Sequence, residues 1–289
     1  MHDDGKRRMV CPFVERKVGE ALDIASPYGF GGFVGAGGSE LVSTSWYRFA
    51  GERGVVCGYI GLHPTLSDPS WHTPSDVHRQ TTLYLLDLTL SVEELFENLS
   101  TNRKRQLKHP SCAIELSDYE ATEFLKEHGA KFFLRKQAAL VSHFTTSTFA
   151  ALAHSSKTFT FGCKAGPMLC ALSMFAYTPY GAEYLFNISL PEAEDYAATL
   201  LWSGVQRLRC LRIPTLNLGG GIRSGDGVAE FKRRFGGKAV PYFCLKQVYN
   251  EAAFTQLCRE YGVDPGDKSG YFPPYRLPLN DFDGVSLRL

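Results

Sequence analysis

The sequence has no excess of charge of either sign, because 31 basic residues are balanced by 30 acidic ones among 289. This balance excludes a global field that would draw the chain to nucleic acid or to a membrane surface. No segment approaches the run of about eighteen apolar residues that marks a membrane-spanning helix. The charged start, MHDDGKRR, also lacks the apolar core of a signal peptide. We therefore expect a cytoplasmic protein without a membrane partner.

Spacings typical of metal sites are missing as well. The eight cysteines include no CxxC pair, and the eight histidines include neither HxxxH nor HExxH. Most of the cysteines lie in apolar segments, as buried free thiols do. We therefore predict no metal site and reduced, structural cysteines. The sequence also lacks a Ser–His–Asp order and a reactive-cysteine signature, which argues against a covalent acyl-enzyme.

The most distinctive stretch that is present is LNLGGGIRSGDGVAEFKRRFGG, residues 216–237. A β-type run enters three consecutive glycines, which let the backbone take positive φ and let another group approach the main chain closely. In the helical pattern that follows, Phe231 and Phe235 stand four residues apart and can face the core together. Lys232 beside them can reach a cavity, where a fixed cation suits an anionic or polarised carbonyl substrate. The alternative is an ordinary strand–loop–helix connection.

Four further segments carry distinctive patterns. They are SPYGFGGF at 26–33, GLHP at 61–64, LDLTLSVEELFENLSTNRKRQLKH at 86–109 and YLFNISLPEAEDYAATLLWSGVQRLR at 184–209. With the stretch at 216–237, and in this order, they resemble the Fem-type (FemAB-like) acyltransferases of the GNAT superfamily. The resemblance implies an α/β (α+β) fold with two GNAT-like lobes, in which mixed, mostly antiparallel sheets are flanked by helices.

Two such lobes imply a boundary within the chain. We place a degenerate N-terminal GNAT-like lobe at residues 1–110 and a C-terminal lobe at 111–289. The last part of the second lobe, 262–289, has four prolines and little periodicity, and we expect it to be an extended tail on the body of the protein.

Capping boxes and apolar periodicity indicate the main elements. Ser91 with Glu94, and Ser117 with Glu120, each form the S-x-x-E pattern that opens a helix, and Gly129 is placed to end the second one. Helices are predicted at 91–107, 117–129 and 132–153, and an antiparallel meander of strands at 157–164, 167–177 and 183–189.

Acyl transfer to an amine requires loss of the amine's proton, stabilisation of the oxyanion and orientation of the acyl carrier. The resemblance assigns Lys232 to substrate and oxyanion binding. Asp226 and Glu230 are the nearest carboxylates in sequence; each could orient the amine or accept its proton, or could be a plain surface charge. Gly220 and Gly221 offer backbone groups to the substrate.

Three other polar residues are candidates for the acceptor side of the site. Tyr28 lies in a glycine-dense aromatic loop and His63 just past a strand end, both in the lobe where the resemblance places acceptor binding. His63 is also a catalytic candidate, because the pKa of histidine suits proton transfer, and a structural histidine is the alternative. Asn187, at a strand end, can donate to a substrate carbonyl or can bond within the sheet.

The acyl donor expected from the resemblance is a coenzyme A thioester. In GNAT proteins the helix N-terminus after the corresponding strand receives the diphosphate through free N–H groups, which places Ser189, Tyr196 and Ala197 at the cofactor. The sequence lacks the Q/R-x-x-G-x-G/A loop of ordinary GNAT enzymes there and carries three acidic residues between 192 and 195. A second place for phosphate is the basic run 103–105, whose charge otherwise complements a helix dipole.

These assignments predict an N-acyltransferase that moves an acyl group directly from acyl-CoA to the amino group of a nucleotide-linked amino sugar in bacterial surface-glycan biosynthesis. Its partners would be these two small molecules. Fem-type peptidoglycan enzymes use aminoacyl-tRNA, so a second hypothesis is an aminoacyl-tRNA-dependent transferase acting on a peptidoglycan precursor. The near-neutral charge and the lack of a heptad arm favour the smaller donor. A third hypothesis is a non-catalytic binding protein of the same fold.

Overall fold

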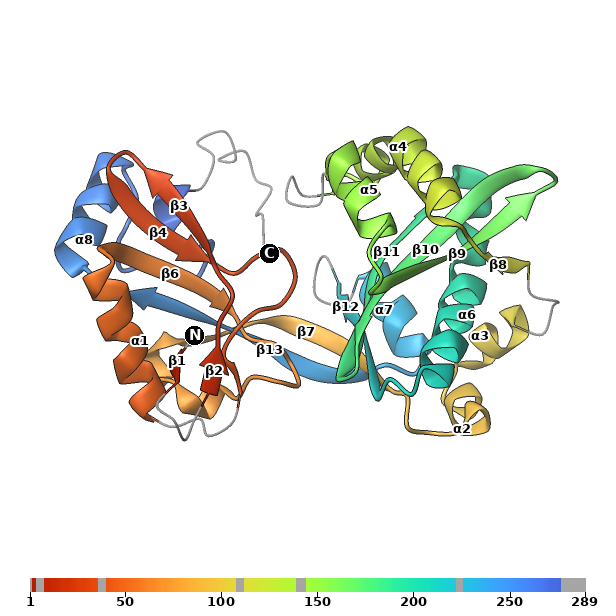
Figure 1. Cartoon of the computed structure of the whole chain (residues 1–289), viewed down its shortest axis with the longest axis horizontal. Helices are drawn as coiled ribbons and strands as arrows, with labels where there is room; N and C mark the ends of the chain where they lie inside the picture. The colour runs from red at the N-terminus through yellow and green to blue at the C-terminus, as the bar shows by residue number, and fades with distance from the viewer. Residues whose placement is uncertain are drawn as a thin grey trace. The chain divides into compact units, whose positions relative to one another are not determined.

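The computed structural model describes residues 2–3, 8–35, 40–107, 112–138, 144–221 and 226–276 (Figure 1). The chain forms two units, of which the first contains Met1–Thr82 and Pro241–Leu289 and the second contains Leu83–Val240. This division differs from the expected single boundary at 110/111, because the first unit is assembled from both ends of the chain. The chain passes between the units within two strands, β7 (Val77–Asp87) and β13 (Lys238–Val248).

The first unit is a sheet with a helix on each face. Strand β4 pairs antiparallel with β3 and parallel with β6, and β6 pairs antiparallel with β13. Successive residues of a strand point to opposite faces, so Val55 of β6 packs with Trp46 of α1, whereas Val56 packs with Phe254 of α8. The bounds are β3 Val14–Val18, β4 Ala21–Ala25, β6 Val55–Gly61, α1 Glu40–Glu52 and α8 Glu251–Glu260. A small separate sheet consists of β1 His2–Asp3, β2 Arg8–Val10 and β5 Val34–Gly35.

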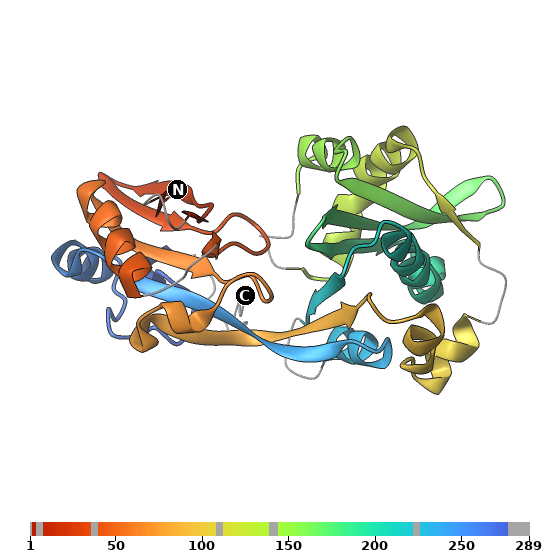
Figure 2. The same cartoon turned by 60° about the horizontal axis from the view of Figure 1, so that its bottom comes forward.

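The second unit has the strand order β7-β12-β11-β10-β9-β8, in which only β11 and β12 run parallel. Helices α4 and α5 cover one face of β9–β11 and α6 covers the other (Figure 2). The strand bounds are β8 Ala113–Glu115, β9 Thr158–Ala165, β10 Met168–Thr178, β11 Gly181–Ser189 and β12 Thr215–Gly220. The helix bounds are α2 Val92–Glu97, α3 Thr101–Gln106, α4 Asp118–Arg135, α5 Thr146–Ala153, α6 Ala197–Cys210 and α7 Gly227–Arg234.

The mixed α/β architecture with helices on both faces of a large mixed sheet confirms the expected fold class. The antiparallel meander is confirmed as β9–β10–β11. Both capping boxes form, with each serine hydroxyl accepting from the backbone N–H of its glutamate and each glutamate accepting from the serine N–H.

Two helix predictions are wrong in their extent. The segment 91–107 is two helices, because Asn98 ends α2, Ser100 takes an extended conformation at the start of α3, and the intervening Leu99 is buried. Helix α4 does not end at Gly129 but continues to Arg135. Gly129 is instead the place where α4 meets the ring of Phe149, which lies 2.7 Å from where a Cβ would stand. Residues 139–143 of the predicted helix 132–153 lie outside the described residues.

The expected C-terminal tail is anchored in the first unit as far as it is described. A short 3-10 turn, Pro274–Arg276, brings Tyr275 and Arg276 to the fully buried carboxylate of Asp23, at 3.1 Å and 2.5 Å. Arg16 contacts the other oxygen of the same carboxylate at 2.7 Å. Residues 277–289 lie outside the described part of the chain. No helix among the described residues has the length and apolarity needed to cross a bilayer.

Candidate active site

The end of β12 is shaped by a bulge that requires glycine. Asn217 lies opposite Leu85 of β7, but Gly220 lies opposite Leu83, so β12 contains one residue more than its partner here. Gly219 takes up the difference with a φ of +76°, a conformation that residues with side chains rarely adopt. A Cβ at Gly219 would also stand 3.1 Å from Nζ of Lys232. The glycine therefore makes room for an ammonium group against the backbone.

Lys232 reaches this bulge from helix α7. The helix begins at Asp226, whose Oδ1 accepts from the backbone N–H of Ala229 at 2.8 Å, and its apolar side buries Phe235 in the core. Lys232 Nζ donates to the carbonyl oxygen of Gly220 at 2.6 Å. Burial lowers the pKa of Lys232 to about 8, against the opposing charge of Asp226. At neutral pH this ammonium is a half-buried cation with one backbone partner, placed at a strand end.

Glu183 of β11, which is not among the residues predicted from the sequence, lies beside the same strand. Glu183 is the register partner of Asn217 in the parallel β11–β12 pair. Burial raises the pKa of Glu183 to about 8, against the opposing effect of the Asn217 amide. A carboxyl group that titrates near neutral pH is suited to accept a proton from an amine. The available signal was an acidic residue near the start of the strand-like run GAEYLFNIS.

The side chain of Asn217 is held in one orientation. Its Oδ1 accepts from the backbone N–H of Gly219 at 2.8 Å, and the residue is 4% exposed. Its buried Nδ2 lies beside the carboxyl of Glu183 and lowers the pKa of that group.

Strands β11 and β12 pair at only two register positions, Ala182 with Leu216 and Glu183 with Asn217, among the residues described. β11 continues to Ser189 along β10, and β12 continues to Gly220 along β7. The two strands therefore stay paired only near the start of β11. Backbone groups at the edge of a strand can bind an extended ligand as an added strand. Lys232, Asn217 and Glu183 stand around this region, which we take as the candidate active site.

Two carboxylates predicted from the sequence have structural contacts. Asp226 caps α7 and acts on Lys232 by its charge. Glu230 pairs with Arg233 at 2.7 Å and with Arg234 at 2.5 Å. These two arginines, through hydrogen bonds, lower the pKa of Glu230 to about 2, so it is a weak proton acceptor. We leave Glu230 outside the candidate site. Gly221 is the last described residue before position 226.

The amide of Asn187 lies inside the sheet. Its Nδ2 donates to the carbonyl oxygen of Leu172 at 3.2 Å and to Ser173 Oγ at 2.9 Å, both on the neighbouring strand β10. This is the alternative role considered for Asn187, a hydrogen bond within the sheet, and it leaves Nδ2 engaged.

The residues expected to hold a coenzyme A diphosphate are also engaged. Ser189 is buried, and its carbonyl oxygen accepts from Arg135 at 2.8 Å. Tyr196 ends a 3-10 turn, Pro191–Tyr196, that precedes α6, and the N–H of Ala197 donates to the carbonyl oxygen of Glu194 within that turn. The Glu194 carboxylate pairs with Lys136 at 2.8 Å. The free N–H groups that a diphosphate requires at a helix start are thus partly occupied here.

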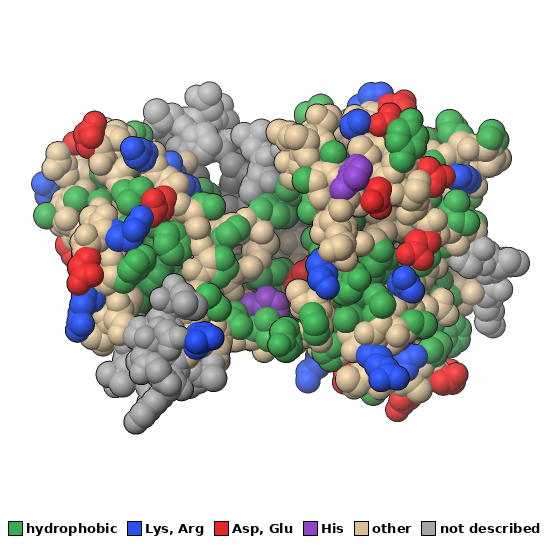
Figure 3. Space-filling model, in the orientation of Figure 1, with side chains coloured by type: hydrophobic (Ala, Val, Ile, Leu, Met, Phe, Trp, Pro, Cys, Tyr) green, Lys and Arg blue, Asp and Glu red, His purple; other side chains and the backbone are tan. Residues whose placement is uncertain are grey.

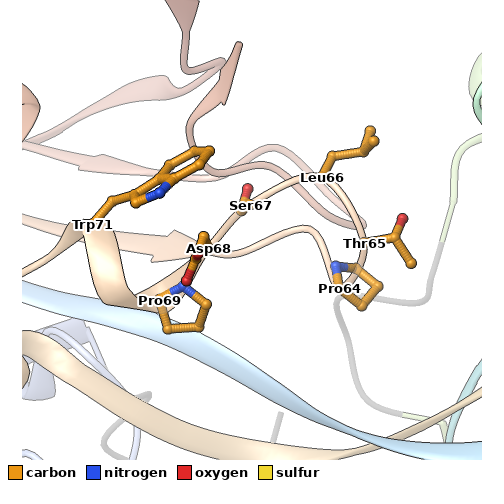
Figure 4. Close-up of a pocket in the computed structure, with 7 residues that line it drawn as sticks. All are labelled: Pro64, Thr65, Leu66, Ser67, Asp68, Pro69 and Trp71. Carbon is orange, nitrogen blue, oxygen red and sulfur yellow. The ribbon is translucent and has the colours of Figure 1, made fainter. Parts of the chain in front are cut away.

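His63 and Tyr28 belong to the first unit. The N–H of His63 donates to the carbonyl oxygen of Gly31 at 3.0 Å, which ties it to the loop that carries Tyr28, and Tyr28 is exposed. Burial lowers the pKa of His63, so the ring is neutral at pH 7. The following segment, Pro64 to Trp71, curls around an open pocket of about 350 Å³ (Figure 4). Among the described residues, no group of three or more potential metal ligands comes together.

No protein-family model matches the chain, and no curated protein matches its sequence. Solved structures do match. The chain is similar to FemX, with a TM-score of 0.67 at 12% identity over 89% of this chain and 88% of FemX. The chain has a Fem-type fold. It is also similar to the C-terminal domain of an inferred lysylphosphatidylglycerol synthetase from Agrobacterium fabrum (TM-score 0.55, 13% identity, 86% and 85% covered). A third match is L-PGS from Bacillus licheniformis (TM-score 0.54, 12% identity, 85% of both chains).

Proposed function

We propose that this protein is an aminoacyltransferase that uses aminoacyl-tRNA as donor and an amino group of a cell-wall precursor as acceptor. The observation that carries the proposal is the half-buried Lys232 ammonium at the Gly219–Gly220 bulge of β12, the strand in which Asn217 lies opposite the half-buried Glu183. The fold is shared with FemX and with a domain named for the synthesis of lysylphosphatidylglycerol, a product that carries an aminoacyl group.

The expected acyl-CoA donor and amino-sugar acceptor gain no comparable support. The N–H of Ala197 and the carbonyl of Ser189 already have protein partners, and the sequence lacks the usual diphosphate loop. An aminoacyl-tRNA presents its ester next to a ribose and needs no diphosphate site. We therefore favour the tRNA-dependent alternative over the acyl-CoA reaction.

The proposed reaction is a direct transfer. The acceptor amine attacks the ester carbonyl of the aminoacyl-tRNA, a C–N bond forms, and the C–O bond to the terminal ribose breaks. Glu183, in its ionised form, accepts the proton that the amine loses, and this proton then passes to the departing ribose oxygen. Lys232 and Nδ2 of Asn217 stabilise the oxyanion of the tetrahedral intermediate, in a partly buried place where such contacts are strongest.

The test is a transfer assay with the purified protein. tRNA charged with a mixture of radiolabelled amino acids is incubated with peptidoglycan precursors, and a parallel reaction supplies acetyl-CoA with a nucleotide-linked amino sugar. We expect label to move from tRNA to a precursor amine. Lys232→Ala should lower kcat by about 10²–10³, as removal of an oxyanion donor does. Lys126→Ala, which removes an exposed lysine paired with Glu123, is the matched control and should retain full activity.

Each other result has a definite meaning. Transfer from acetyl-CoA but not from tRNA would restore the acyl-CoA hypothesis and reject ours. Transfer by Lys232→Ala at the wild-type rate would remove this lysine from the mechanism. If neither donor is used and neither raises the melting temperature, the non-catalytic binding protein is the better account, because a ligand that binds only the native state raises that temperature.

A further inference from the structure

Arg103 on α3 is a cation held between an aromatic ring and a neutral side chain. Its guanidinium lies over the ring of Phe231 on α7, with Cζ 4.3 Å from the ring centroid. Its Nη1 donates to the neutral side chain of Gln106 at 2.6 Å. No carboxylate pairs with Arg103 among the residues that the structure describes. By contrast, the next residue, Lys104, pairs with Glu97 at 2.6 Å.

A second guanidinium, that of Arg234, stands close to the first. The N–H of Ser100, at the start of α3, donates to the carbonyl oxygen of Arg234 at 2.9 Å, which joins α3 to the end of α7. Burial and then the charge of Arg234 lower the pKa of Arg103. Glu230 is shared between Arg233 and Arg234. Arg103 therefore lies near Arg234, whose carboxylate partner Glu230 is also shared with Arg233, and the junction of α3 with α7 carries excess positive charge.

Two polar atoms at this junction are unsatisfied. Arg103 Nε and Ser100 Oγ are buried and have no hydrogen-bond partner in the described part of the chain. Ser100 is also at the N-cap position of α3, yet its side chain makes no capping hydrogen bond. Like charges held together next to unpaired donors are unfavourable in the free protein. An anion bound here would relieve both penalties, and guanidinium groups bind phosphate through paired N–H donors.

We infer that Arg103 and Arg234 bind a phosphodiester of RNA next to the reaction centre. The inference rests on the proposed function. Helix α7 carries Lys232 between Phe231, which supports Arg103, and Arg234. A helix with its side chains is only about 10–12 Å across, so the cation at the bulge and the arginine pair are close neighbours around one helix.

The arginine pair lies only about one helix diameter from Lys232. At this short distance the chemistry of the donor favours RNA over acyl-CoA. In aminoacyl-tRNA the first phosphodiester directly follows the nucleoside that carries the ester. In acyl-CoA the whole pantetheine arm separates the thioester from the phosphates. The distribution of surface charge also fits a single, local phosphate contact. Over the face seen in Figure 3, basic and acidic side chains are interspersed rather than gathered into one basic field.

The experiment measures binding of a synthetic RNA hairpin with the single-stranded 3′ end of a tRNA, by fluorescence anisotropy at several salt concentrations. Arg103→Gln and Arg234→Gln should each raise Kd about tenfold, and each should reduce the slope of log K against log salt by about 1, as loss of one phosphate contact does. Arg105→Gln is the matched control: it lies on the same helix, removes the same charge, and its side chain donates to Asn102 at 2.8 Å. Its Kd should change less than about twofold.

Melting temperatures confirm that each variant folds, and Arg103→Lys, which keeps the charge but not the planar fork, should bind with intermediate affinity. Equal losses for Arg103→Gln and Arg105→Gln would overturn the site in favour of unspecific charge attraction. Normal hairpin binding by Arg103→Gln and Arg234→Gln, with aminoacyl transfer intact in the wild type, would reject the phosphate site and leave the proposed function standing. Weakened binding in both variants, with no transfer from any charged tRNA, would support the site and reject the proposed function. Weakened coenzyme A binding with unchanged hairpin binding would overturn the assignment to RNA.

Discussion

Glu183 and Lys232 have pKa values near 8 for the same reason, which is that burial disfavours the charged form of each. The shifts run in opposite directions, because one group is an acid and the other a base. The proposed reaction needs Glu183 ionised and Lys232 protonated, so both conditions are met together only in a narrow range around that pH. Such pairs of shifted groups are typical of active sites, and structural networks produce them too.

The first prediction at this scale concerns the stability of the Glu183→Gln variant. Between the ordinary glutamate pKa of 4.5 and the folded value of about 8, the folded state keeps a proton on Glu183 that the unfolded state has lost. The free energy of unfolding therefore falls as the pH rises through this window. The glutamine amide in the variant cannot ionise, so the variant should gain stability relative to the wild type, by on the order of a few kcal/mol between about pH 5 and pH 8.

Urea unfolding of both proteins at several pH values measures this difference. Lys232, whose folded pKa is about 8, begins to lose its proton as the pH approaches that value, but it is present in both proteins. Other titrating groups are common to the two proteins and cancel. A difference between variant and wild type that stays constant with pH would show that the carboxyl of Glu183 is not desolvated in the folded protein.

The sequence located Lys232 but not Glu183, and the reason is physical. Lys232 lies in a stretch whose glycines and aromatic spacing are local features, and its Nζ does meet the backbone at Gly220. The pKa of Glu183 is raised because its side chain is desolvated in the folded sheet. It also depends on Asn217, which is 34 positions away in the chain. Packing of this kind leaves no local pattern. The catalytic roles of both residues remain predictions.

For the helices, local sequence signals predicted the presence of an element more reliably than the residues at which it begins and ends. The capping boxes of α2 and α4 form as expected, because a capping box needs only four adjacent residues. Gly129 was misread as a helix end, since glycine is common there. Its actual role depends on a tertiary contact with Phe149, which the sequence around Gly129 does not reveal.

This contact gives a prediction for Gly129→Ala. An added Cβ would lie 2.7 Å from the Phe149 ring, so α4 and α5 must move apart or the ring must leave its rotamer. We expect a loss of about 1–3 kcal/mol of stability, as for other overpacked cores. Gly51→Ala is the matched control, because Gly51 is also helical but meets nothing within 4 Å among the described residues. The Gly51→Ala variant should be as stable as the wild type or more stable by up to about 1 kcal/mol. Thermal melting of the two variants compares them directly, and equal effects would contradict the contact.

At the scale of the whole molecule, the first unit is discontinuous in sequence, which local patterns do not reveal. The first unit needs β13 and α8, which follow the entire second unit in the chain. Strand β13 pairs with β6 from Cys57 to Gly61. The expected boundary at 110/111 came from reading the lobes as consecutive, whereas contacts between distant segments define the first unit.

The final prediction follows from this topology and concerns a chain that ends at residue 240. The deletion removes the partner of β6, and it removes Gln247 and Tyr249, whose oxygens accept from Nε1 of the buried Trp46 at 3.0 Å and 2.8 Å. It also removes the Gln247 amide that donates to the buried carboxylate of Asp76 at 3.0 Å. Buried polar groups left without partners are costly, so the first unit should unfold. The second unit, Leu83–Val240, loses none of its own residues and should stay folded.

Hydrogen exchange followed by mass spectrometry distinguishes the two units in the truncated chain. Peptides from residues 8–82 should exchange at the rate of unfolded chain, while peptides from β9–β11 and α6 should keep the protection that they have in the full-length protein. The intact chain provides the reference for both. Continued protection of β4 and β6 after the truncation would mean that the first unit holds together without its C-terminal strand. Loss of protection throughout would mean that the second unit depends on the first for its stability, and that the two fold as one cooperative body.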